Sequence, residues 1–186
     1  APRRLRPHDA YDRRIDRVEF HPAYHGLMEA AVAHGVAGLP WRGGVPGAPA
    51  ARAALSYLHH QADAGTSCPL TMTHAAVPVL RREPGLREWA DKAAAFAYDP
   101  REAPIADKRG VTLGMGMTEK QGGSDVRANA TVATPQADGS YALVGHKWFF
   151  SAPMSDGFLV LAQAPGGISC FLMPRRLPDG AKNPFR

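Results

Sequence analysis

The pattern of hydrophobic residues changes once along this chain, near Arg109, and the change limits the folds that are open to it. Before Arg109, apolar residues and alanines recur every three or four positions, as on one face of a helix. After Arg109, short apolar runs alternate with turns rich in Gly, Pro and Asp. We therefore predict an α+β protein, with an all-helical domain over residues 1–108 and an antiparallel β domain over residues 109–186.

Four segments carry the helical spacing and five carry the β pattern. The helical segments begin at His21, Gly47, Ser67 and Leu86. The β runs are "GVTLGMGM", "ANATVAT", "SYALVGHKWFF", "GFLVLAQ" and "ISCFLMP", and the connections "PQADG" and "APGG" are typical of hairpins. In the second helix, one shared face is predicted to lie in the core; its residues are Ala54, Leu55, Leu58 and Ala62.

Much of the basic excess lies in the first twenty residues. The chain has a formal net charge of +5, and arginines are frequent in "APRRLRPHDAYDRRIDRVEF". Acidic residues are interleaved with them, which is typical of a solvated surface arm; they are Asp9, Asp12, Asp16 and Glu19. An anionic partner, either a CoA phosphate or nucleic acid, is the alternative.

Cysteine usage and hydropathy indicate a compartment. Cys68 and Cys170 lie far apart and match no metal or redox spacing, so we expect two buried thiols in a reducing compartment. No run approaches the ~18 apolar residues of a membrane span. The first residues lack the apolar core of a secretory signal and are too acidic for a transit peptide. These features predict a cytoplasmic protein that does not enter a membrane.

No metal site is predicted. His21 and His25 have the spacing of a zinc helix, but the acidic residue between them and a third ligand are missing. His59 and His60 are adjacent and would point in different directions from a helix. The G-x-S-x-G motif of a nucleophilic serine does not occur in the sequence.

The stretch "GMGMTEKQGGSDVRANA", from Gly114 to Ala130, is a candidate binding loop. It lacks the third glycine and the crossover helix of a dinucleotide fingerprint, and it lacks the Gly-Lys-Ser or Gly-Lys-Thr of a Walker loop. A strand ending at Met117 would lead to Gly122 and Gly123, whose backbone N–H groups can approach a ligand closely, and Ser124 adds a hydroxyl donor. An anion or a polar heterocycle fits such a loop; a glycine-rich turn without a ligand is the alternative.

Several motifs resemble those of the acyl-CoA dehydrogenase family. "MTEKQGGSD" is similar to the flavin loop TEPxAGSD of that family, and "GHKWFFSAP" resembles the segment G-x-K-x-W-I-T-N that follows it. "FHPAYHGLM" and "AGTSCPLTMTHAA" further resemble the AidB-type adaptive-response branch. The likeness runs from about Asp12 to the end of the chain, with the motifs in the order and spacing of the family.

The resemblance implies an FAD site in which the backbone of the glycine loop meets the cofactor. The residues that would bind FAD are Met115, Met117, Thr118, Gly123, Ser124, Phe149, Phe150 and Ser151. Met117 and Thr118 would contact the isoalloxazine ring and Ser124 the phosphate side. Ser151 takes the place of a family threonine whose hydroxyl faces flavin N5. Phe149 replaces the usual tryptophan, so that stacking is kept and the indole donor is lost. Thr118 and Ser151 would also border the acyl substrate.

The implied activity is the α,β-dehydrogenation of a short or branched acyl-CoA, with hydride transfer to flavin N5. The catalytic carboxylate of the family lies in a C-terminal helical domain, beyond Arg186, so we expect no catalytic base here, Glu119 included, and an inactive isolated chain. The chain looks like an incomplete part of a family member, and the family is commonly tetrameric. The alternative function is a DNA-associated protective flavoprotein of the alkylation response, with weak or vestigial catalysis, that would contact DNA through the absent C-terminal region.

Overall fold

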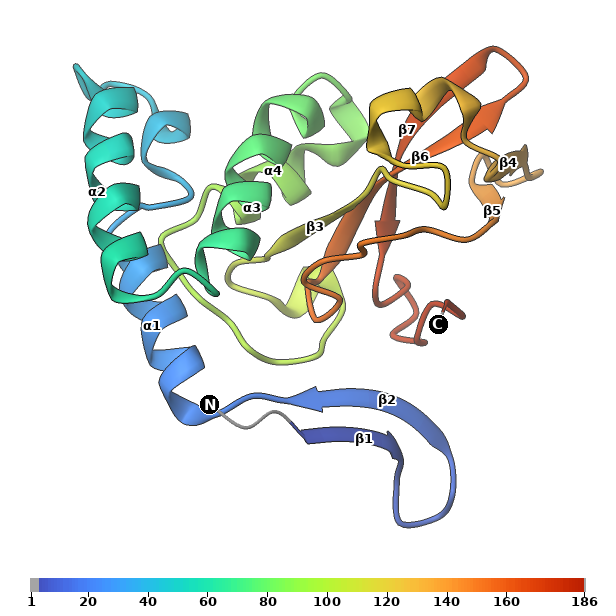
Figure 1. The fold of residues 1–186 in the computed structure, drawn as a ribbon, viewed down its shortest axis with the longest axis horizontal. Coiled ribbons are helices and arrows are strands. Elements are labelled where there is room, and N and C mark those ends of the chain that lie inside the picture. The colour runs from blue at the N-terminus through green and yellow to red at the C-terminus, as the bar shows by residue number, and fades with distance from the viewer. Residues whose placement is uncertain (1–3, 186) are drawn as a thin grey trace.

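The computed structural model describes residues 4–185, which form a group of helices, a sheet and a separate hairpin (Figure 1). The helices are α1 (Pro22–Ala33), α2 (Ala48–Ala62), α3 (Ser67–Leu80) and α4 (Arg87–Ala93), with short 3-10 helices η1 (Leu39–Arg42), η2 (Pro84–Leu86), η3 (Ile105–Asp107) and η4 (Gly123–Ala128). The strands are β1 (Arg4–His8), β2 (Arg14–Glu19), β3 (Leu113–Gly116), β4 (Val132–Pro135), β5 (Tyr141–Val144), β6 (Gly157–Ala164) and β7 (Gly167–Pro174). Helices followed by a sheet confirm the α+β class.

The N-terminal hairpin is the first difference from the sequence-based expectation. β1 and β2 pair antiparallel, with Leu5 opposite Val18 and Arg6 opposite Arg17, so the segment before Arg109 is not all-helical. Apolar and charged residues alternate in β1, which is a β pattern, but not in β2, where Ile15 and Val18 lie three positions apart, and the high charge of the segment favoured an arm without regular structure. β1 is exposed along its whole length, in agreement with a surface position, whereas β2 is mostly half-buried. Residues 1–3 of the predicted arm lie outside the described residues.

α1 begins where the sequence supplies a cap. The Nδ1 atom of His21 accepts a hydrogen bond from the backbone N–H of Ala23 at 3.1 Å. Pro22 occupies the first helical position, where a missing N–H leaves no hydrogen bond unmade. Met28 of α1 is fully buried in a small cluster with Leu70 of α3. This cluster joins α1 to α3, with Leu55 of α2 packed against it.

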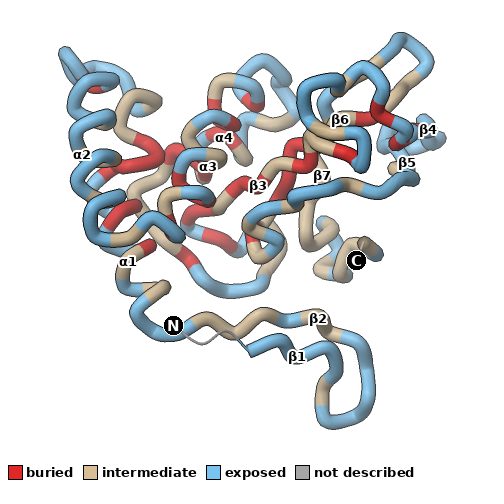
Figure 2. The backbone as a smooth tube through the Cα atoms, in the orientation of Figure 1, coloured by how far each residue is buried: buried red, intermediate tan, exposed pale blue. Residues whose placement is uncertain are grey.

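The predicted core face of α2 is wrong. Leu55 is half-buried, but Leu58 is 65% exposed, and Ala54 and Ala62 are exposed as well. Helical spacing establishes that these residues share a face, but it does not show whether another element covers that face. α2 lies at the outer edge of the helices, and Figure 2 shows it as mostly exposed.

β6 is the central strand of a five-stranded sheet. It pairs antiparallel with β7 along its whole length, and parallel with β3 over its first half. β4 joins β6 in parallel through Val132 opposite Gln163 and forms an antiparallel hairpin with β5. Both hairpins expected from "PQADG" and "APGG" are therefore present, but the sheet is mixed rather than antiparallel. The long connection over residues 117–156 returns the chain in its original direction, which a short turn cannot do.

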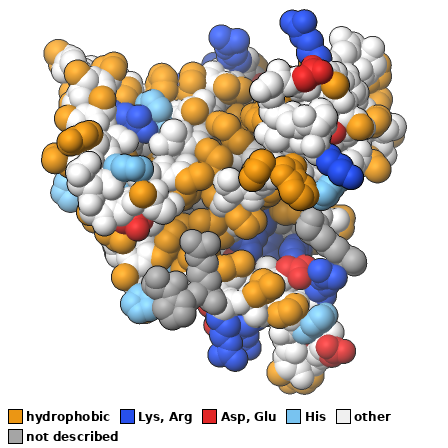
Figure 3. Space-filling model, in the orientation of Figure 1, with side chains coloured by type: hydrophobic (Ala, Val, Ile, Leu, Met, Phe, Trp, Pro, Cys, Tyr) orange, Lys and Arg blue, Asp and Glu red, His pale blue; other side chains and the backbone are white. Residues whose placement is uncertain are grey.

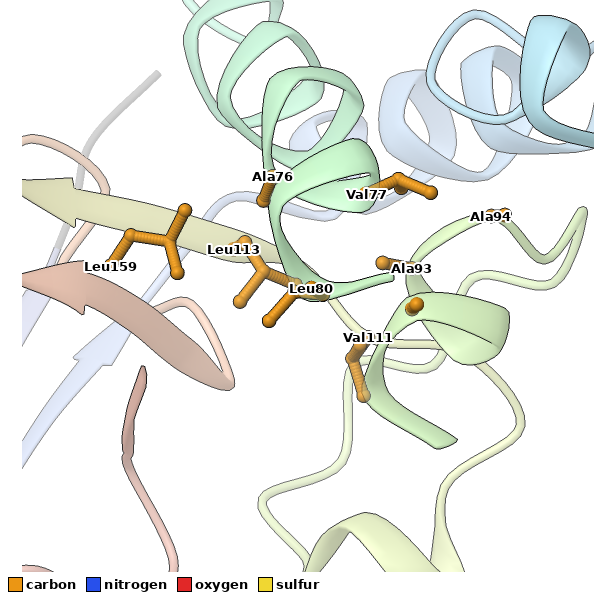
Figure 4. Packing of buried hydrophobic residues seen from close by; sticks show 9 residues of the cluster. Ala76, Val77, Leu80, Ala93, Ala94, Val111, Leu113 and Leu159 are labelled. Atoms are coloured by element: carbon orange, nitrogen blue, oxygen red, sulfur yellow. The ribbon is translucent and has the colours of Figure 1, made fainter. Parts of the chain in front are cut away.

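The main hydrophobic core joins the helices to the sheet. α3 and α4 pack against β3 and β6, as the close view in Figure 4 shows. Leu113 of β3 is fully buried there, and its backbone N–H donates to Thr73 Oγ1 of α3 at 2.9 Å. The buried residues are Ala76, Val77, Leu80, Ala90, Ala93, Ala94, Val111, Leu113 and Leu159. One core thus crosses position 109, and a division into two domains at that position stays a prediction.

Both cysteines are exposed, contrary to the expectation of buried thiols. Cys68 lies in the first turn of α3 beside a cavity, and Cys170 occupies an exposed position of β7. Cysteine is buried on average, but the elements around each position decide its exposure. Within residues 4–185, no helix is both long and apolar enough to span a membrane.

Candidate functional site

Residues 147–151, here called the wall segment, lie directly against β3, and glycines make this contact possible. A Cβ atom on Gly116 would come within 2.6 Å of the Phe150 ring, and one on Gly114 within 3.4 Å of the Ser151 carbonyl. A side chain at Gly116 would therefore push the wall segment off the strand. The glycines of "LGMG" thus bring two parts of the predicted site into contact.

Two hydrogen bonds fix the end of β3. The backbone N–H of Trp148 donates to the Thr118 carbonyl at 2.9 Å, and Asn129 Nδ2 donates to the Met117 carbonyl, also at 2.9 Å. Thr118 is half-buried. The side chains of Met115 and Met117 pack against the main core. The strand end is therefore a rigid edge between the wall segment and the loop that follows.

Glycines also let the loop close onto this edge. Gly122 has a φ of 104°, which an L side chain rarely adopts, and Gly123 begins η4. A Cβ atom on Gly123 would lie 3.0 Å from Thr118 Oγ1, closer than most such contacts. Ser124 follows as an exposed residue in the first turn of η4. The loop thus holds its backbone close to Thr118.

Glu119 is buried beneath the loop and holds it to the wall segment. Its carboxylate accepts hydrogen bonds from the N–H groups of Ala130 (2.6 Å) and Thr131 (3.0 Å) and from the Thr131 hydroxyl, and it forms an ion pair with Lys147 at 2.7 Å. Burial by itself would raise the pKa of Glu119, but the hydrogen bonds from Lys147 and Thr131 and from the backbone lower it to about 2. An ionised carboxylate with such a low pKa is a poor proton acceptor.

An aromatic surface stands beside the strand end. Trp148 is 49% exposed and Phe149 is 79% exposed, with their rings edge to face at 6.0 Å. Phe149 has a φ of 53°, a left-handed conformation that is uncommon for a bulky residue and that often marks a functional position. Ser151 is exposed, and its hydroxyl donates to the Phe149 carbonyl at 3.3 Å. The surface combines stacking area with a hydroxyl group.

The structure places the predicted cofactor-binding residues in two groups. Met117, Thr118 and Gly123 meet at the strand end, with Phe149 and Ser151 on the adjoining wall segment. Phe150 is turned away from this surface, because its ring packs against Gly116 and against Phe158 at 4.7 Å. Met115 packs toward the main core, as does the side chain of Met117, and Ser124 stands exposed on the loop.

Two features of the site were missed by the sequence reasoning. The first is Trp148, whose backbone N–H donates to the Thr118 carbonyl and whose exposed ring enlarges the aromatic surface. The second is the Glu119–Lys147 ion pair, which connects the loop to the wall segment. A signal for the pair exists in the sequence, since a loop glutamate without a catalytic role needs a charged partner if it is buried. The lysine in "GHKWFF" is such a partner.

His25, His59 and His60 make contacts within the fold. His25 shares a hydrogen bond with the Tyr98 hydroxyl at 2.9 Å, and His59 shares one with Thr66 Oγ1 at 2.8 Å. His60 lies 3.2 Å from the Ser67 hydroxyl. In the part of the chain that the structure describes, no three His, Cys, Asp or Glu residues are grouped to hold a metal ion.

Comparison with known proteins first defines the class. The family model described as "Acyl-CoA dehydrogenase, middle domain" matches residues 114–183, which include the loop and the wall segment. The structure of ACDH-11 from Caenorhabditis elegans in complex with C11-CoA superimposes with a TM-score of 0.82 at 28% identity, over 97% of this chain and 32% of that chain. A glutaryl-CoA dehydrogenase from Mycobacterium smegmatis in complex with FADH2 shares the fold, with a TM-score of 0.59 at 22% identity, over 84% of this chain and 42% of that chain. The fold is that of the acyl-CoA dehydrogenases.

The N-terminal residues show which family within the acyl-CoA dehydrogenases the chain belongs to. The family model described as "Adaptive response protein AidB N-terminal domain" matches residues 1–100. AidB of Escherichia coli (strain K12) is 51% identical over 188 residues, which cover 100% of this chain and 35% of AidB. The chain belongs to the AidB family, within the acyl-CoA dehydrogenases. It spans about a third of the length of these relatives.

Proposed function

We propose that the complete protein carrying this chain is an FAD-dependent oxidoreductase of the acyl-CoA dehydrogenase type, and that this chain forms one wall of its flavin site. The observation that carries the proposal is the meeting of the strand end, the glycine loop and the wall segment beside exposed aromatic rings. Membership of the AidB family supports the same function.

The described residues fit a flavin in three respects. Trp148 and Phe149 expose aromatic area of the kind that stacks against a planar ring system. An added Cβ atom on Gly122 would meet nothing within 4 Å, so the loop backbone is open there to a close approach, which suits N–H donation to anionic or polar groups. The Ser151 hydroxyl lies beside Phe149, and the Thr118 hydroxyl lies beside Gly123 of the loop. Apolar surface with a few convergent polar groups is typical of cofactor sites.

The contribution of this chain is to bind and orient. Met117 and Thr118 would lie along the ring system, Phe149 against its face, and Ser124 toward the phosphates. Thr118 and Ser151 would also border the acyl group. When bound, FAD would accept the hydride removed from the β carbon of an acyl thioester. Phe150 would support these residues from below, because its ring packs inward, and the side chains of Met115 and Met117 both pack against the main core.

The proton on the α carbon requires a base, and Glu119 does not suit this role. Its carboxylate is engaged by four donors, and its pKa is lowered to about 2 by hydrogen bonds that outweigh the effect of burial. A general base works best with a pKa near the operating pH. We therefore propose that the base is supplied by another part of the complete protein, and that the isolated chain is inactive.

Two measurements on the complete protein test this proposal. Denaturation of fully loaded protein should release FAD, and a panel of short and branched acyl-CoAs should bleach the flavin under anaerobic conditions.

Phe149→Ala should weaken FAD binding about tenfold, since an aromatic stacking pair contributes ~0.5–1.5 kcal/mol beyond its buried area. Val144→Ala, at an exposed residue of β5, is the matched control. Folded protein that releases no flavin would disprove the assignment of the loop.

A protective function on DNA is the second candidate, and the name of the matched family, an adaptive response protein, favours it. In this case catalysis is weak, and DNA is bound mainly by a region outside this chain. The measurement that separates the two is flavin bleaching by acyl-CoAs compared with salt-dependent DNA binding. A homo-tetramer and a cytoplasmic location stay predictions from the family resemblance and the composition.

A further inference from the structure

A cavity of about 460 Å³ lies where β2, the start of α1, residues 98–103 and the segments that precede β6 and follow β7 meet. Its volume lies within the roughly 300–1,000 Å³ of small-molecule sites. None of the residues assigned to FAD lines this cavity, so it is separate from the candidate flavin site. In Figure 3, Lys and Arg side chains are set back between the hairpin and the rest of the molecule.

We propose that this cavity is a second binding site, which takes a small organic anion between Arg17 of the hairpin and Arg176 after β7. The ligand would carry a phosphate or a carboxylate group and a flat apolar part. The site is independent of flavin and acyl-CoA binding. It gives the hairpin a part in ligand binding, in place of the solvated arm expected from its charge.

The carboxylates of the lining are already engaged, so the cavity does not suit a cation. Each of them has a basic partner at ion-pair distance. The pairs are Asp99–Arg101 (2.7 Å), Asp156–Lys108 (2.6 Å), Glu102–Arg175 (2.8 Å), Glu102–Arg176 (3.1 Å) and Glu19–Arg6 (2.9 Å). A cationic ligand would have to displace a guanidinium or ammonium group that is already in place.

The basic groups of the lining are not all matched in this way. Arg176 shares the carboxylate of Glu102 with a second arginine, so one of these two positive charges has no counterpart. Arg17 lies opposite Arg6 in the hairpin, and Glu19 pairs with Arg6. Among the described residues, the Arg17 side chain forms no hydrogen bond or ion pair. The cavity therefore has an excess of positive charge, which attracts an anion.

Arg176 is held weakly enough to turn toward an anion. Its guanidinium donates to Glu102 at 3.1 Å and to the Gly180 carbonyl at 3.3 Å, both longer than usual for a charged hydrogen bond. Its Nε is buried and has no hydrogen-bond partner within the described residues. A buried donor without an acceptor is unfavourable. A small turn that directs Nε at an anionic oxygen would remove this cost.

The two arginines are kept on the same cavity by a tie between the hairpin and the sheet. Lys182 pairs with Arg176 in an antiparallel bridge. Its Nζ donates to the Ile15 carbonyl at 3.0 Å and lies 3.3 Å from the Asp16 carboxylate, directly before Arg17 in β2. An anion in the cavity thus meets positioned guanidinium groups, which bind phosphate and carboxylate oxygens through paired hydrogen bonds.

The lining near α1 is aromatic and suits the apolar part of the ligand. The Phe20 and Tyr24 rings stack with their centroids 4.2 Å apart. The Tyr98 hydroxyl shares a hydrogen bond with His25 at 2.9 Å, and burial raises the pKa of Tyr98, so this hydroxyl stays neutral. No negative charge from these rings repels the anion. Flat aromatic area favours an organic anion over a hydrated inorganic one.

The test uses the complete protein and measures the binding of phenyl phosphate and of benzoate by calorimetry, with phenol as the uncharged probe. At least one of the two anions should bind, and phenol should not. Arg17→Gln and Arg176→Gln should each weaken this binding about tenfold, because a hydrogen bond to a charged group is lost. Arg176→Lys should weaken it as well, since an ammonium group lacks the fork. Arg13→Gln, at an exposed arginine of the hairpin that does not line the cavity, is the matched control and should change the affinity by less than about twofold.

The outcomes decide the proposal whether or not the protein oxidises acyl-CoAs. It is wrong if neither anion binds, which is also the result expected if another segment of the complete protein fills the cavity. It is wrong if Arg13→Gln weakens binding as much as Arg17→Gln, since net charge alone would then explain the binding. Displacement of the probe by FAD or by an acyl-CoA would also overturn it, because the cavity would not be a separate site. If Arg176→Gln fails to fold, Arg17→Gln, at an exposed residue, decides the result.

Discussion

Two buried lysine–carboxylate pairs connect different parts of the molecule, and they differ in which partner is indispensable. Lys108 and Asp156, 2.6 Å apart, join the segment after α4 to the start of β6. Lys147 and Glu119, 2.7 Å apart, join the wall segment to the glycine loop. Both lysine side chains are almost completely buried. The first pair lies where helices meet the sheet, and the second lies within the candidate flavin site.

Where the helices meet the sheet, Lys108 is the partner that makes several hydrogen bonds. Its three N–H groups are directed at the carbonyl oxygens of Asp99 (2.6 Å) and Arg101 (2.7 Å) and at Asp156. The other oxygen of Asp156 accepts from the backbone N–H of Thr112 at 2.8 Å. Burial raises the pKa of Asp156 despite the nearby charge of Lys108. The charge of this carboxylate is therefore stabilised mainly by one lysine.

In the candidate site, the Glu119 carboxylate is the partner that accepts several hydrogen bonds. Glu119 accepts from Lys147 and also from Ala130 and twice from Thr131, so the lysine is one donor among four. A buried pair seldom adds net stability over apolar residues, but removing one partner leaves an unpaired buried charge. The comparison indicates that loss of the lysine should damage the fold at the junction and mainly displace the wall segment at the site.

The largest expected effect tests the junction. Lys108→Met should lower the free energy of unfolding by about 3–5 kcal/mol, because Asp156 and two carbonyl groups lose their partner in a buried place. Urea unfolding measures it, with Lys120→Met at an exposed lysine as the control. Adding Asp156→Asn should restore part of the loss, since no charge is then left unpaired. A loss below about 1 kcal/mol for Lys108→Met would remove the distinction between the pairs.

Acid should act on the site through Glu119. Its pKa falls from 4.5 to about 2 on folding, where hydrogen bonds outweigh burial. At about 1.4 kcal/mol per pKa unit this corresponds to roughly 3 kcal/mol. Because the folded pKa is the lower one, this stability is fully present above pH 4.5 and is lost as the pH falls through about 2. Urea unfolding between pH 6 and pH 3, in steps of about one pH unit, should show the decline. Glu119→Gln should flatten it, and Glu88→Gln, at a largely exposed residue, should not.

Lys147→Met tests the second buried pair, for comparison with Lys108→Met. Three donors to Glu119 remain, so the loss of stability should be smaller than for Lys108→Met. The wall segment loses its tie to the loop, and FAD affinity of the complete protein should fall about tenfold, equivalent to ~1.4 kcal/mol. Flavin titration of the apoprotein measures this, again with Lys120→Met as the control. A loss of stability without a loss of FAD affinity would make the pair a purely structural one.

Much of the fold follows from sequence patterns, because the patterns report local geometry. The hairpins at "PQADG" and "APGG" were predicted correctly, since turn chemistry fixes which strands are joined. The parallel pairing of β3 with β6 was missed, because that pairing is set by a long connection and by packing against α3 and α4. The exposure of Leu58 and of both cysteines was missed for a related reason: exposure depends on neighbours that are distant in the sequence.

The candidate site was found through motif resemblance rather than through physical pattern. The residues alone left a ligand-free turn open as an alternative for "GMGMTEKQGGSD". What the motif could not convey is how the parts are held together: Gly116 against Phe150, Trp148 on Thr118, and the fourfold engagement of Glu119. These contacts connect residues far apart in the sequence. The individual roles of Met117, Thr118, Phe149 and Ser151 toward FAD stay predictions.

A smaller effect is expected at Ser151, on the exposed side of the site. Ser151→Ala in the complete protein should remove one hydrogen bond to the flavin, at a cost of about 0.5–1.5 kcal/mol if the partner is neutral. FAD should therefore be retained, while its reduction by an acyl-CoA slows. Rapid-mixing absorbance measures the rate, and Ser140→Ala, in the turn of the β4–β5 hairpin, is the control. An unchanged rate would place the reacting atoms away from Ser151.

The smallest effect is expected for the exposed ion pairs of the hairpin, which have distances like those of the buried pairs but a different environment. Arg6 lies 2.9 Å from Glu19 and Arg13 lies 2.7 Å from Asp9, and in both pairs the arginine is largely exposed. Water and salt screen such pairs, and the acidic partners reduce the positive charge that DNA would meet. We therefore expect only a small change in the salt dependence of any DNA binding when Arg3, Arg4 and Arg6 are replaced together. The slope should change by well under the ~3 units of three phosphate contacts. Arg3 lies outside the described residues. Titration of labelled duplex DNA at several salt concentrations measures the slope. A change of the full ~3 units would contradict this prediction and would make the hairpin a DNA-binding element, with arginines that bind phosphates despite their acidic neighbours.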